Sequence, residues 1–217
     1  FAIYVALCDL FEGYHGLIDG NMAFYYNPIT TLLEPIAEDI DATTDTANLG
    51  ISMINGYLET PKLWADMSSS LGNRLILTRL FQDNKFTEKY MYYLSKFSKE
   101  NYLKSFFKNV EEDLNKELNT IYTDYHDYSF DINNNILVVK QKKIRELLDP
   151  PIGLLSYFHK EKGQNIHFKV GAVQYLPVEI VSVNYDGIDF PILNKEKIIF
   201  GKKKYKLINY NEIIVKI

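Results

Sequence analysis

The sequence predicts an α+β fold in two parts, a helical part with one β-hairpin followed by a small antiparallel β-module. Apolar residues at helical spacing dominate the first part, in residues 1–12 and again in residues 73–148. The strands MAFYYN and LLEPIA flank the turn Asn27-Pro28-Ile29-Thr30, whose Asn-Pro pair favours turn initiation, so they predict a hairpin. After residue 151 the pattern changes to short apolar or alternating runs separated by Gly, Asn and Asp. Such runs are typical of a small β-module.

The first predicted element is a buried helix from Phe1 to Glu12, followed by Gly13 where a helix C-terminus is expected. Cys8 lies on this helix among apolar neighbours, so we expect a buried core thiol rather than a reactive one. Because Cys8 is the only cysteine, an intrachain disulfide framework and a Cys-based zinc site are excluded.

Polar side chains concentrate on the two sides of the predicted hairpin. The loop GYHGLIDGN enters it and carries His15, Asp19 and Asn21, while the segment EDIDATTD leaves it and carries Asp39 and Asp41. Because a hairpin brings its two ends together, the loop and the acidic segment can converge and hold a hard divalent ion with oxygen ligands. The alternative is that EDID is a solvated acidic loop that caps the following segment.

The middle of the chain predicts a layer of helices, which ends at the breaker Asp149-Pro150-Pro151 after a last helix over 135–148. This breaker predicts the module boundary, with the helical module over residues 1–150 and the sandwich-like β-module over 151–217. An aromatic stripe within the helices is expected to form core and helix interface rather than a ligand cage; its members are Tyr90, Tyr93, Phe97, Tyr102 and Phe106.

Composition indicates a folded chain, with 47% hydrophobic and 24% charged residues. Of the 24 Lys and Arg and 28 Asp and Glu, residues 1–150 carry 14 and 22, and residues 151–217 carry 10 and 6. The acidic first part is a poor nucleic-acid surface and suits a site that concentrates divalent cations. The run KEKIIFGKKKYK is expected to be the solvated face of edge strands, with contact to a polyanion as the alternative. No stretch is apolar for long enough to predict a transmembrane segment.

The run DLFEGYHGLIDGNMAFYYNPITTLLEPIAEDID resembles the core of the spore coat protein H (CotH) kinase-like family. The resemblance covers residues 1–45, is compatible with the family's helical lobe up to residue 148, and leaves the C-terminal module outside. It implies the helical lobe of an atypical protein-kinase-like fold, which uses ATP and Mg²⁺ or Mn²⁺ to phosphorylate hydroxyls of a coat or surface protein. It also implies that Asn21 binds the cofactor, that Asp39 and Asp41 are metal ligands, and that the protein works in the spore coat, the cell envelope or outside the cell.

Two positions depart from the family pattern. Glu38 replaces the Trp before the first metal-binding acid, and the usual loop Asp falls near His15 and Gly16. These departures leave three alternatives: His15 is the catalytic base, Asp19 is the base from a shifted position, or the site is catalytically weak. His15 can also have a structural role, bonding the loop backbone. Because the chain begins at Phe1 without a Met, we expect the natural protein to extend upstream and to carry the nucleotide-binding lobe there.

Two other functions compete with the kinase hypothesis. One is a noncatalytic spore-coat or cell-surface protein that retains the fold and uses the β-module for adhesion or assembly. The other is a carbohydrate-binding or carbohydrate-active protein, suggested by the 17 tyrosines and the β-module. The sequence offers no pair of carboxylates that can be assigned to the two sides of a glycosidic bond, which disfavours the carbohydrate-active form.

Overall fold

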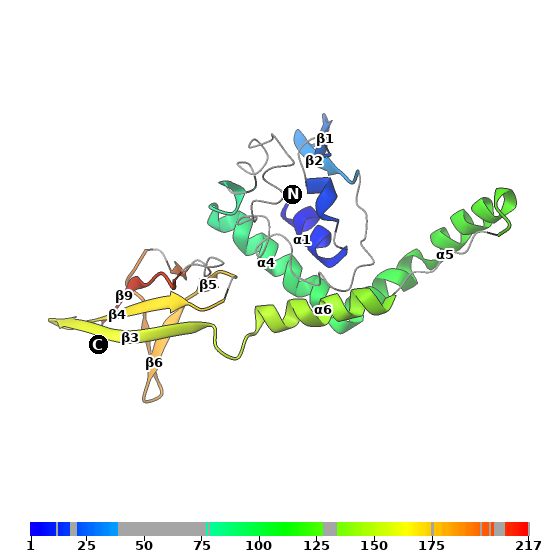
Figure 1. The fold of residues 1–217 in the computed structure, drawn as a ribbon. Coiled ribbons are helices and arrows are strands. Elements are labelled where there is room, and N and C mark those ends of the chain that lie inside the picture. The colour runs from blue at the N-terminus through cyan, green and yellow to red at the C-terminus, as the bar shows by residue number, and fades with distance from the viewer. Residues whose placement is uncertain are drawn as a thin grey trace. The chain divides into compact units, whose positions relative to one another are not determined.

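The computed structural model describes residues 1–11, 13–17, 21–38, 77, 79–127, 134–174, 176–195, 197–199, 201 and 207–216. These residues form four α-helices and several small antiparallel sheets, which confirms the predicted α+β class (Figure 1). The chain divides into two compact units, Phe1–Arg145 and Glu146–Ile217. This division lies within the last helix, and the boundary at Asp149-Pro150-Pro151 stays a prediction.

The core of the first unit lies between α1 (Ala2–Phe11) and α4 (Asn84–Ser98), which pack side by side (Figure 1). Seven of the ten residues of α1 are buried, so this helix is the centre of the unit rather than a surface element. α4 begins where the Asp83 carboxylate accepts a hydrogen bond from the Phe86 N–H. The buried apolar residues of this core include Val5, Leu10, Leu17, Leu77, Tyr90 and Leu94.

Two further helices follow α4. Lys99 has extended backbone angles and separates α4 from the long helix α5 (Glu100–Asp124). α6 (Asn134–Leu148) is tied to this break by the buried side chain of Gln141. Its amide group donates hydrogen bonds to the Phe97 and Lys99 carbonyls at 2.7 and 2.9 Å. Phe97 lies in the last turn of α4, where carbonyl groups have no partner within the helix.

The predicted aromatic stripe is partly core and partly helix interface. Tyr90 and Phe97 are buried, whereas Phe106 is 37% exposed. Ring contacts continue along the helices from Phe97 to Tyr102 and from Tyr102 to Phe106, with centroids 4.8 and 6.3 Å apart. Phe106 in turn contacts Phe11 of α1. The prediction of a packing role is therefore confirmed for the buried members and for these interface contacts.

The predicted hairpin consists of β1 (Ala23–Asn27) and β2 (Leu32–Ile36), paired antiparallel from Ala23 opposite Ile36 to Asn27 opposite Leu32. The Asn27 side chain organises the turn by accepting hydrogen bonds from the Ile29 and Thr30 N–H groups. Thr31 completes the turn with a positive φ of 56°.

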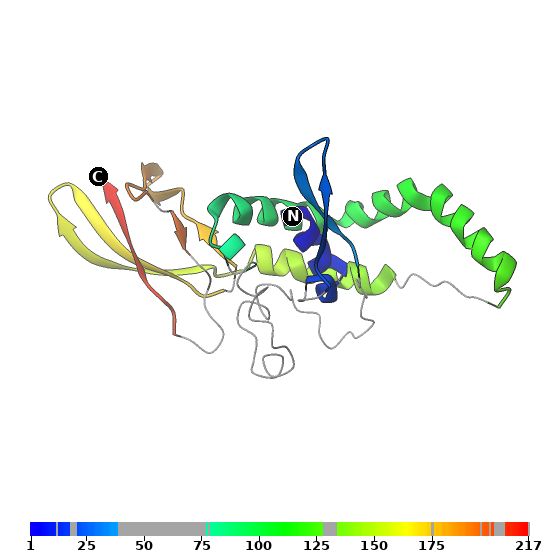
Figure 2. The same ribbon diagram turned by 90° about the horizontal axis from the view of Figure 1, so that it is seen from above.

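The second unit is built on a three-stranded antiparallel sheet in the order β3-β4-β9. Its strands are β3 (Leu154–Lys162), β4 (Asn165–Ala172) and β9 (Asn211–Lys216), drawn in yellow and red in Figure 2. Two short strands, β5 (Val178–Glu179) and β8 (Ile198–Ile199), form a separate pair.

A second hairpin in this unit joins β6 (Ser182–Tyr185) to β7 (Ile188–Pro191). Its turn residues Asp186 and Gly187 both have positive φ, 52° and 80°, as a two-residue hairpin turn requires. The hairpin predicted through Tyr185-Asp186-Gly187 is therefore confirmed. None of the helices in the described part of the chain is long and apolar enough to cross a membrane.

The core of the second unit lies on one face of the three-stranded sheet. It is formed by Val170, Ala172, Ile192, Ile199, Ile213 and Val215. Gly171 faces the other side of β4, where the chain segment 208–210 crosses the strand closely. A Cβ atom at Gly171 would lie 2.4 Å from Ile208 Cγ2 and 3.0 Å from the Asn209 carbonyl oxygen, so this crossing requires glycine.

Candidate functional site

The loop after α1 is held by hydrogen bonds that return to the helix. The Gly13 N–H donates to the Cys8 carbonyl at 2.9 Å, and the Tyr4 hydroxyl donates to the Gly16 carbonyl at 3.2 Å. Between these two contacts the chain forms the short 3₁₀ helix η1 (Tyr14–Leu17), whose last residue, Leu17, is fully buried. The backbone at His15 is therefore fixed at both ends of η1, as a loop that positions a functional side chain requires.

A buried hydrogen bond connects α1 to α4 one residue beyond Cys8. The Tyr90 hydroxyl donates to Asp9 Oδ2 at 2.5 Å, and both residues are almost completely buried. Burial, followed by the charge of Asp9 and this hydrogen bond, raises the pKa of Tyr90 well above its ordinary value, so its hydroxyl stays protonated and continues to donate. This contact fixes the end of α1 from which the loop departs.

Cys8 is a buried and unreactive thiol, as the sequence predicts. Burial, and after it the charge of Asp9, raises the pKa of Cys8 to about 12. The thiolate, which is the nucleophilic form, is therefore negligible at neutral pH. Burial also raises the pKa of Tyr4 to about 12, so the hydroxyl that holds Gly16 remains a donor.

The hairpin register sets the geometry of the residues on its two sides. Ala23 and Ile36 are the pair nearest the open end of the hairpin. Asn21 precedes this pair by two residues and Glu38 follows it by two, so both leave from the same end. The Glu38 N–H donates to the Ile36 carbonyl at 3.1 Å, which bends the chain directly after β2. The acidic segment therefore begins beside the end of the glycine-rich loop.

Only some of the five residues predicted for the site lie in the described part of the chain. Asn21 is described, and its side chain is partly buried just before β1. His15 lies in η1, but its side chain is outside the described residues, as are Asp19, Asp39 and Asp41. The convergence of Asn21 with Asp39 and Asp41 therefore stays a prediction. Among the described residues, no three His, Cys, Asp or Glu side chains gather as a metal site would require.

Sequence reasoning missed the residues that support the loop. Asp9 was visible only as an acid that interrupts an apolar helix, and its partner Tyr90 is 81 residues away in the chain. Tyr4 and Gly16 are 12 residues apart and offered no spacing signal either. A charged residue on the buried face of a helix is the one signal that could have indicated a specific polar partner.

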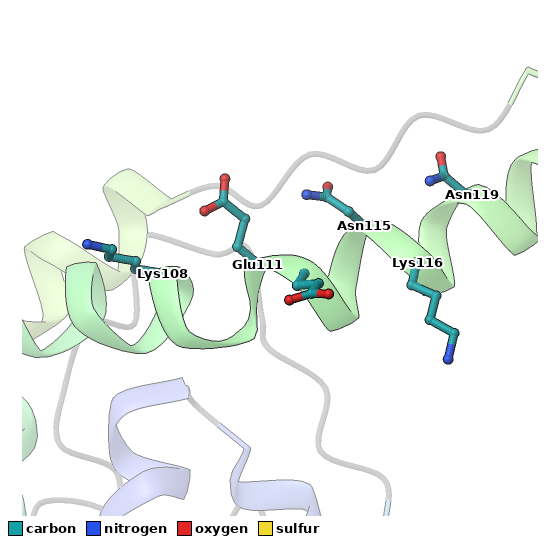
Figure 3. A pocket seen from close by; sticks show the side chains of 6 residues that line it. Lys108, Glu111, Asn115, Lys116 and Asn119 are labelled. Atoms are coloured by element: carbon teal, nitrogen blue, oxygen red, sulfur yellow. The ribbon is translucent and has the colours of Figure 1, made fainter.

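The structure also shows a shallow hollow on α5, which contains none of the residues predicted for this site among its described lining residues. It is lined by Lys108, Glu111, Glu112, Asn115, Lys116 and Asn119, all from one helix, and Figure 3 shows their side chains standing around it. The described residues that line the hollow are polar and exposed, so they offer no apolar wall against which a small ligand could be enclosed.

Comparison with known proteins gives no match to a protein-family model, to a curated protein or to a solved structure. The resemblance to the CotH kinase-like family thus depends on the residues of the loop, the hairpin and the acidic segment. What it implies for function is a proposal that experiment must test.

Proposed function

We propose that the first unit is part of an atypical kinase that transfers a phosphoryl group from ATP to hydroxyl groups of a protein substrate, with Mg²⁺ or Mn²⁺ as the metal. The observation that supports it is the hairpin register, which starts the segment of Asp39 and Asp41 at the same end of the hairpin as Asn21. A loop, a hairpin and a metal-binding acid occur in this order in kinases, where the metal neutralises charge on the transferred phosphoryl group.

The donor set fits the proposed metal. Asn21 supplies an amide oxygen, and Asp39 and Asp41 supply carboxylates. Hard divalent cations such as Mg²⁺ prefer oxygen ligands and are commonly bound through one or two carboxylates together with substrate phosphates. When bound, the ion would orient the phosphates and offset their negative charge, and these three side chains would hold it.

The proposed base lies on the loop between α1 and the hairpin. His15 or Asp19 would accept the proton of the incoming hydroxyl, which the transferred phosphoryl group replaces. Backbone hydrogen bonds from Gly13 and Gly16, and the Tyr4 hydroxyl, limit the freedom of η1. The buried pair of Asp9 and Tyr90 supports the helix behind this loop, which is the rigid background that a positioned base requires.

Calorimetry on the full-length protein tests the proposal. Titration of the preformed complex of Mg²⁺ or Mn²⁺ with ATP into the protein should show binding, and Asp39→Ala should abolish it. Asp113→Ala is the matched control, because Asp113 is an exposed acid on α5. If no metal binds, or if both variants bind as the unchanged protein does, the kinase proposal is wrong and a noncatalytic coat or surface role becomes the better account.

The pH dependence of phosphoryl transfer distinguishes the two candidate bases. If His15 is the base, the rate of the metal-bound enzyme rises with pH through the titration of this imidazole, and His15→Ala removes the rise. An unchanged pH profile in His15→Ala would exclude this role and leave Asp19.

A further inference from the structure

Within the part of the chain that the structure describes, the helix α5 is long and almost entirely uncovered. Of its 25 residues, all of which the structure describes, Leu103 is the only one that is buried. In Figures 1 and 2 no other described helix or strand of the first unit lies beside its C-terminal half. Because most helical stability in proteins comes from packing an amphipathic face, a helix of this length is expected to have a partner along that half.

An apolar stripe runs along this uncovered part. Along one face of the helix after Leu103, apolar residues follow at intervals of four, three, four, four and three residues. We call these residues, Phe107, Val110, Leu114, Leu118 and Ile121, the α5 stripe. The pattern 4-3-4 repeats every 11 residues, about 3.67 residues per turn, so it stays on one face of a nearly straight helix. None of the five side chains is buried, and Ile121 is 38% exposed. The stripe can thus receive a second straight helix.

Acidic residues border the α5 stripe on both sides. At about 100° per residue, Glu111 and Glu117 lie about 60° to either side of Leu114, and Asp113 lies beyond Glu117. Lys116, the only basic residue between positions 111 and 124, lies on the back of the helix, and Figure 3 shows its side chain pointing away from those of Glu111 and Asn115. Lys104 and Lys108 lie on the Glu111 side nearer the N-terminus of the helix, so the border is negative from Glu111 onwards, with Asp113 and Glu117 on one side of the stripe and Glu111 on the other.

Repulsion between acidic residues disfavours a second copy of α5 as the partner of the stripe. The stripe is symmetric about Leu114, so an antiparallel pair of α5 helices would match its apolar residues. That pairing, however, would bring Asp113 and Glu117 of one copy within a helical turn of the same two acids of the other. A parallel pair would place Glu111 of one copy close to Asp113 of the other. Like charges at such distances are unfavourable, so a basic partner complements the border better.

We propose that the α5 stripe docks an amphipathic helix of a partner protein whose apolar face is bordered by Lys or Arg. The partner's apolar side chains would pack between Phe107 and Ile121, and its basic side chains would pair with Glu111, Asp113 and Glu117. This interaction does not depend on the proposed kinase function, because α5 carries none of the residues predicted for that site.

A designed peptide tests the proposal on the 217-residue chain. The probe is a fluorescein-labelled 22-residue helical peptide with Leu at the spacing of the α5 stripe, Lys at the bordering positions and Ala elsewhere; the matched control peptide carries Glu in place of Lys. Fluorescence anisotropy should show binding of the Lys peptide and none of the Glu peptide. Leu114→Asp should weaken binding by about tenfold or more, equivalent to about 1.4 kcal/mol.

Leu114→Asp separates docking from nonspecific attraction, because it adds negative charge while removing an apolar contact. Asn109→Asp adds the same charge on the opposite face of α5 and should leave the affinity unchanged. Circular dichroism checks that both variants keep their helix content. Equal binding of the two peptides, equal effects of the two variants, or absence of binding would overturn the proposal. Self-association of the chain that Leu114→Asp abolishes would also overturn it, and would assign the stripe to a second copy.

Discussion

Each of the two units is held together internally by polar contacts between residues far apart in the chain. The contacts in the first unit are more deeply buried than those in the second. In the first unit the Tyr90 hydroxyl donates to Asp9 inside a helical core. In the second, Glu212 on β9 accepts from the buried His167 on β4 and pairs with Lys160 on β3, at 2.9 and 3.2 Å, and the side chains of Glu212 and Lys160 are 34% and 49% exposed. Burial makes the first contact costly to break, whereas solvent screening weakens the second. The first unit should therefore depend on single buried side chains and the second on close backbone packing.

Removal of the Tyr90 side chain should have the largest effect on stability. Tyr90 is fully buried, and truncation of a buried aromatic residue costs about 3–5 kcal/mol, so Tyr90→Ala should reduce the free energy of unfolding by that amount. Tyr92→Ala on the same helix should change it little, because Tyr92 is 62% exposed. Urea denaturation followed by far-UV circular dichroism measures both, since the described helices belong mainly to the first unit. Equal effects of the two substitutions would contradict the packing described for α4.

Tyr90→Phe isolates the hydroxyl from the ring. It keeps most of the packing but removes the donor to Asp9, and loss of one partner of a buried polar group costs about 1–3 kcal/mol. The same denaturation experiment should therefore place Tyr90→Phe between the unchanged protein and Tyr90→Ala. A Tyr90→Phe protein as stable as the unchanged one would show that the hydrogen bond contributes nothing.

In the second unit the sensitive position is a glycine. Gly171→Ala places a methyl group against Ile208 and the Asn209 backbone, and overpacking of this kind costs about 1–3 kcal/mol. Gly153→Ala is the control, because its added Cβ would meet other atoms only at 3.8 Å, an ordinary contact distance. Hydrogen exchange of β4 and β9 amides should accelerate in Gly171→Ala and stay unchanged in Gly153→Ala. Acceleration in neither variant would contradict the close crossing of segment 208–210.

The last comparison concerns pH, and the effects of pH have opposite signs in the two units. The pKa of Tyr90 is raised by burial and that of Tyr4 is raised to about 12, so below the ordinary tyrosine pKa of 10.0 neither residue makes stability depend on pH. Above pH 10.0, these two tyrosines release their protons in the unfolded chain but keep them in the folded unit. Stability of the first unit should then fall by about 1.4 kcal/mol per pH unit for each such tyrosine.

In the second unit the hydrogen bond from His167, and after it the one from Lys160, lowers the pKa of Glu212 below its ordinary value of 4.5. The ionised Glu212 therefore stabilises the folded unit above pH 4.5, and this stabilisation is lost as the pH falls through the lowered pKa. Hydrogen exchange at several pH values should therefore show α1 amides weakening at alkaline pH and β9 amides at acid pH. The same pH response in both units would contradict the assignment of these contacts.

Local patterns predicted much of the fold, because local residues determine it. Asn27 organises the first turn, the Asp186-Gly187 pair adopts the positive φ angles of the second, and the apolar spacing before Gly13 gives the buried helix α1. Contacts between distant segments were not predicted. The contacts of Glu212 with His167 and Lys160 require the register of three strands, which the sequence pattern alone does not specify.

The candidate site likewise has features that local sequence patterns predicted and features that depend on contacts between distant segments. The order of loop, hairpin and acidic segment could be seen in the sequence, and the hairpin register agrees with a common starting point for Asn21 and Glu38. The support beneath the loop, from Tyr4 to Gly16 and from Tyr90 to Asp9, depends on packing between α1, η1 and α4. No spacing rule connects these residues.

Paramagnetic NMR with Mn²⁺ and ATP tests the proposed convergence of the two sides of the hairpin most directly. Mn²⁺ broadens the resonances of nuclei close to it, so the amide signals of Asn21 and Glu38 should broaden selectively, while that of Asn184 in the second unit should not. The double variant Asp39→Ala/Asp41→Ala should restore the broadened signals. Broadening that persists in the double variant, or that never appears at Asn21 and Glu38, would contradict a metal site at this end of the hairpin.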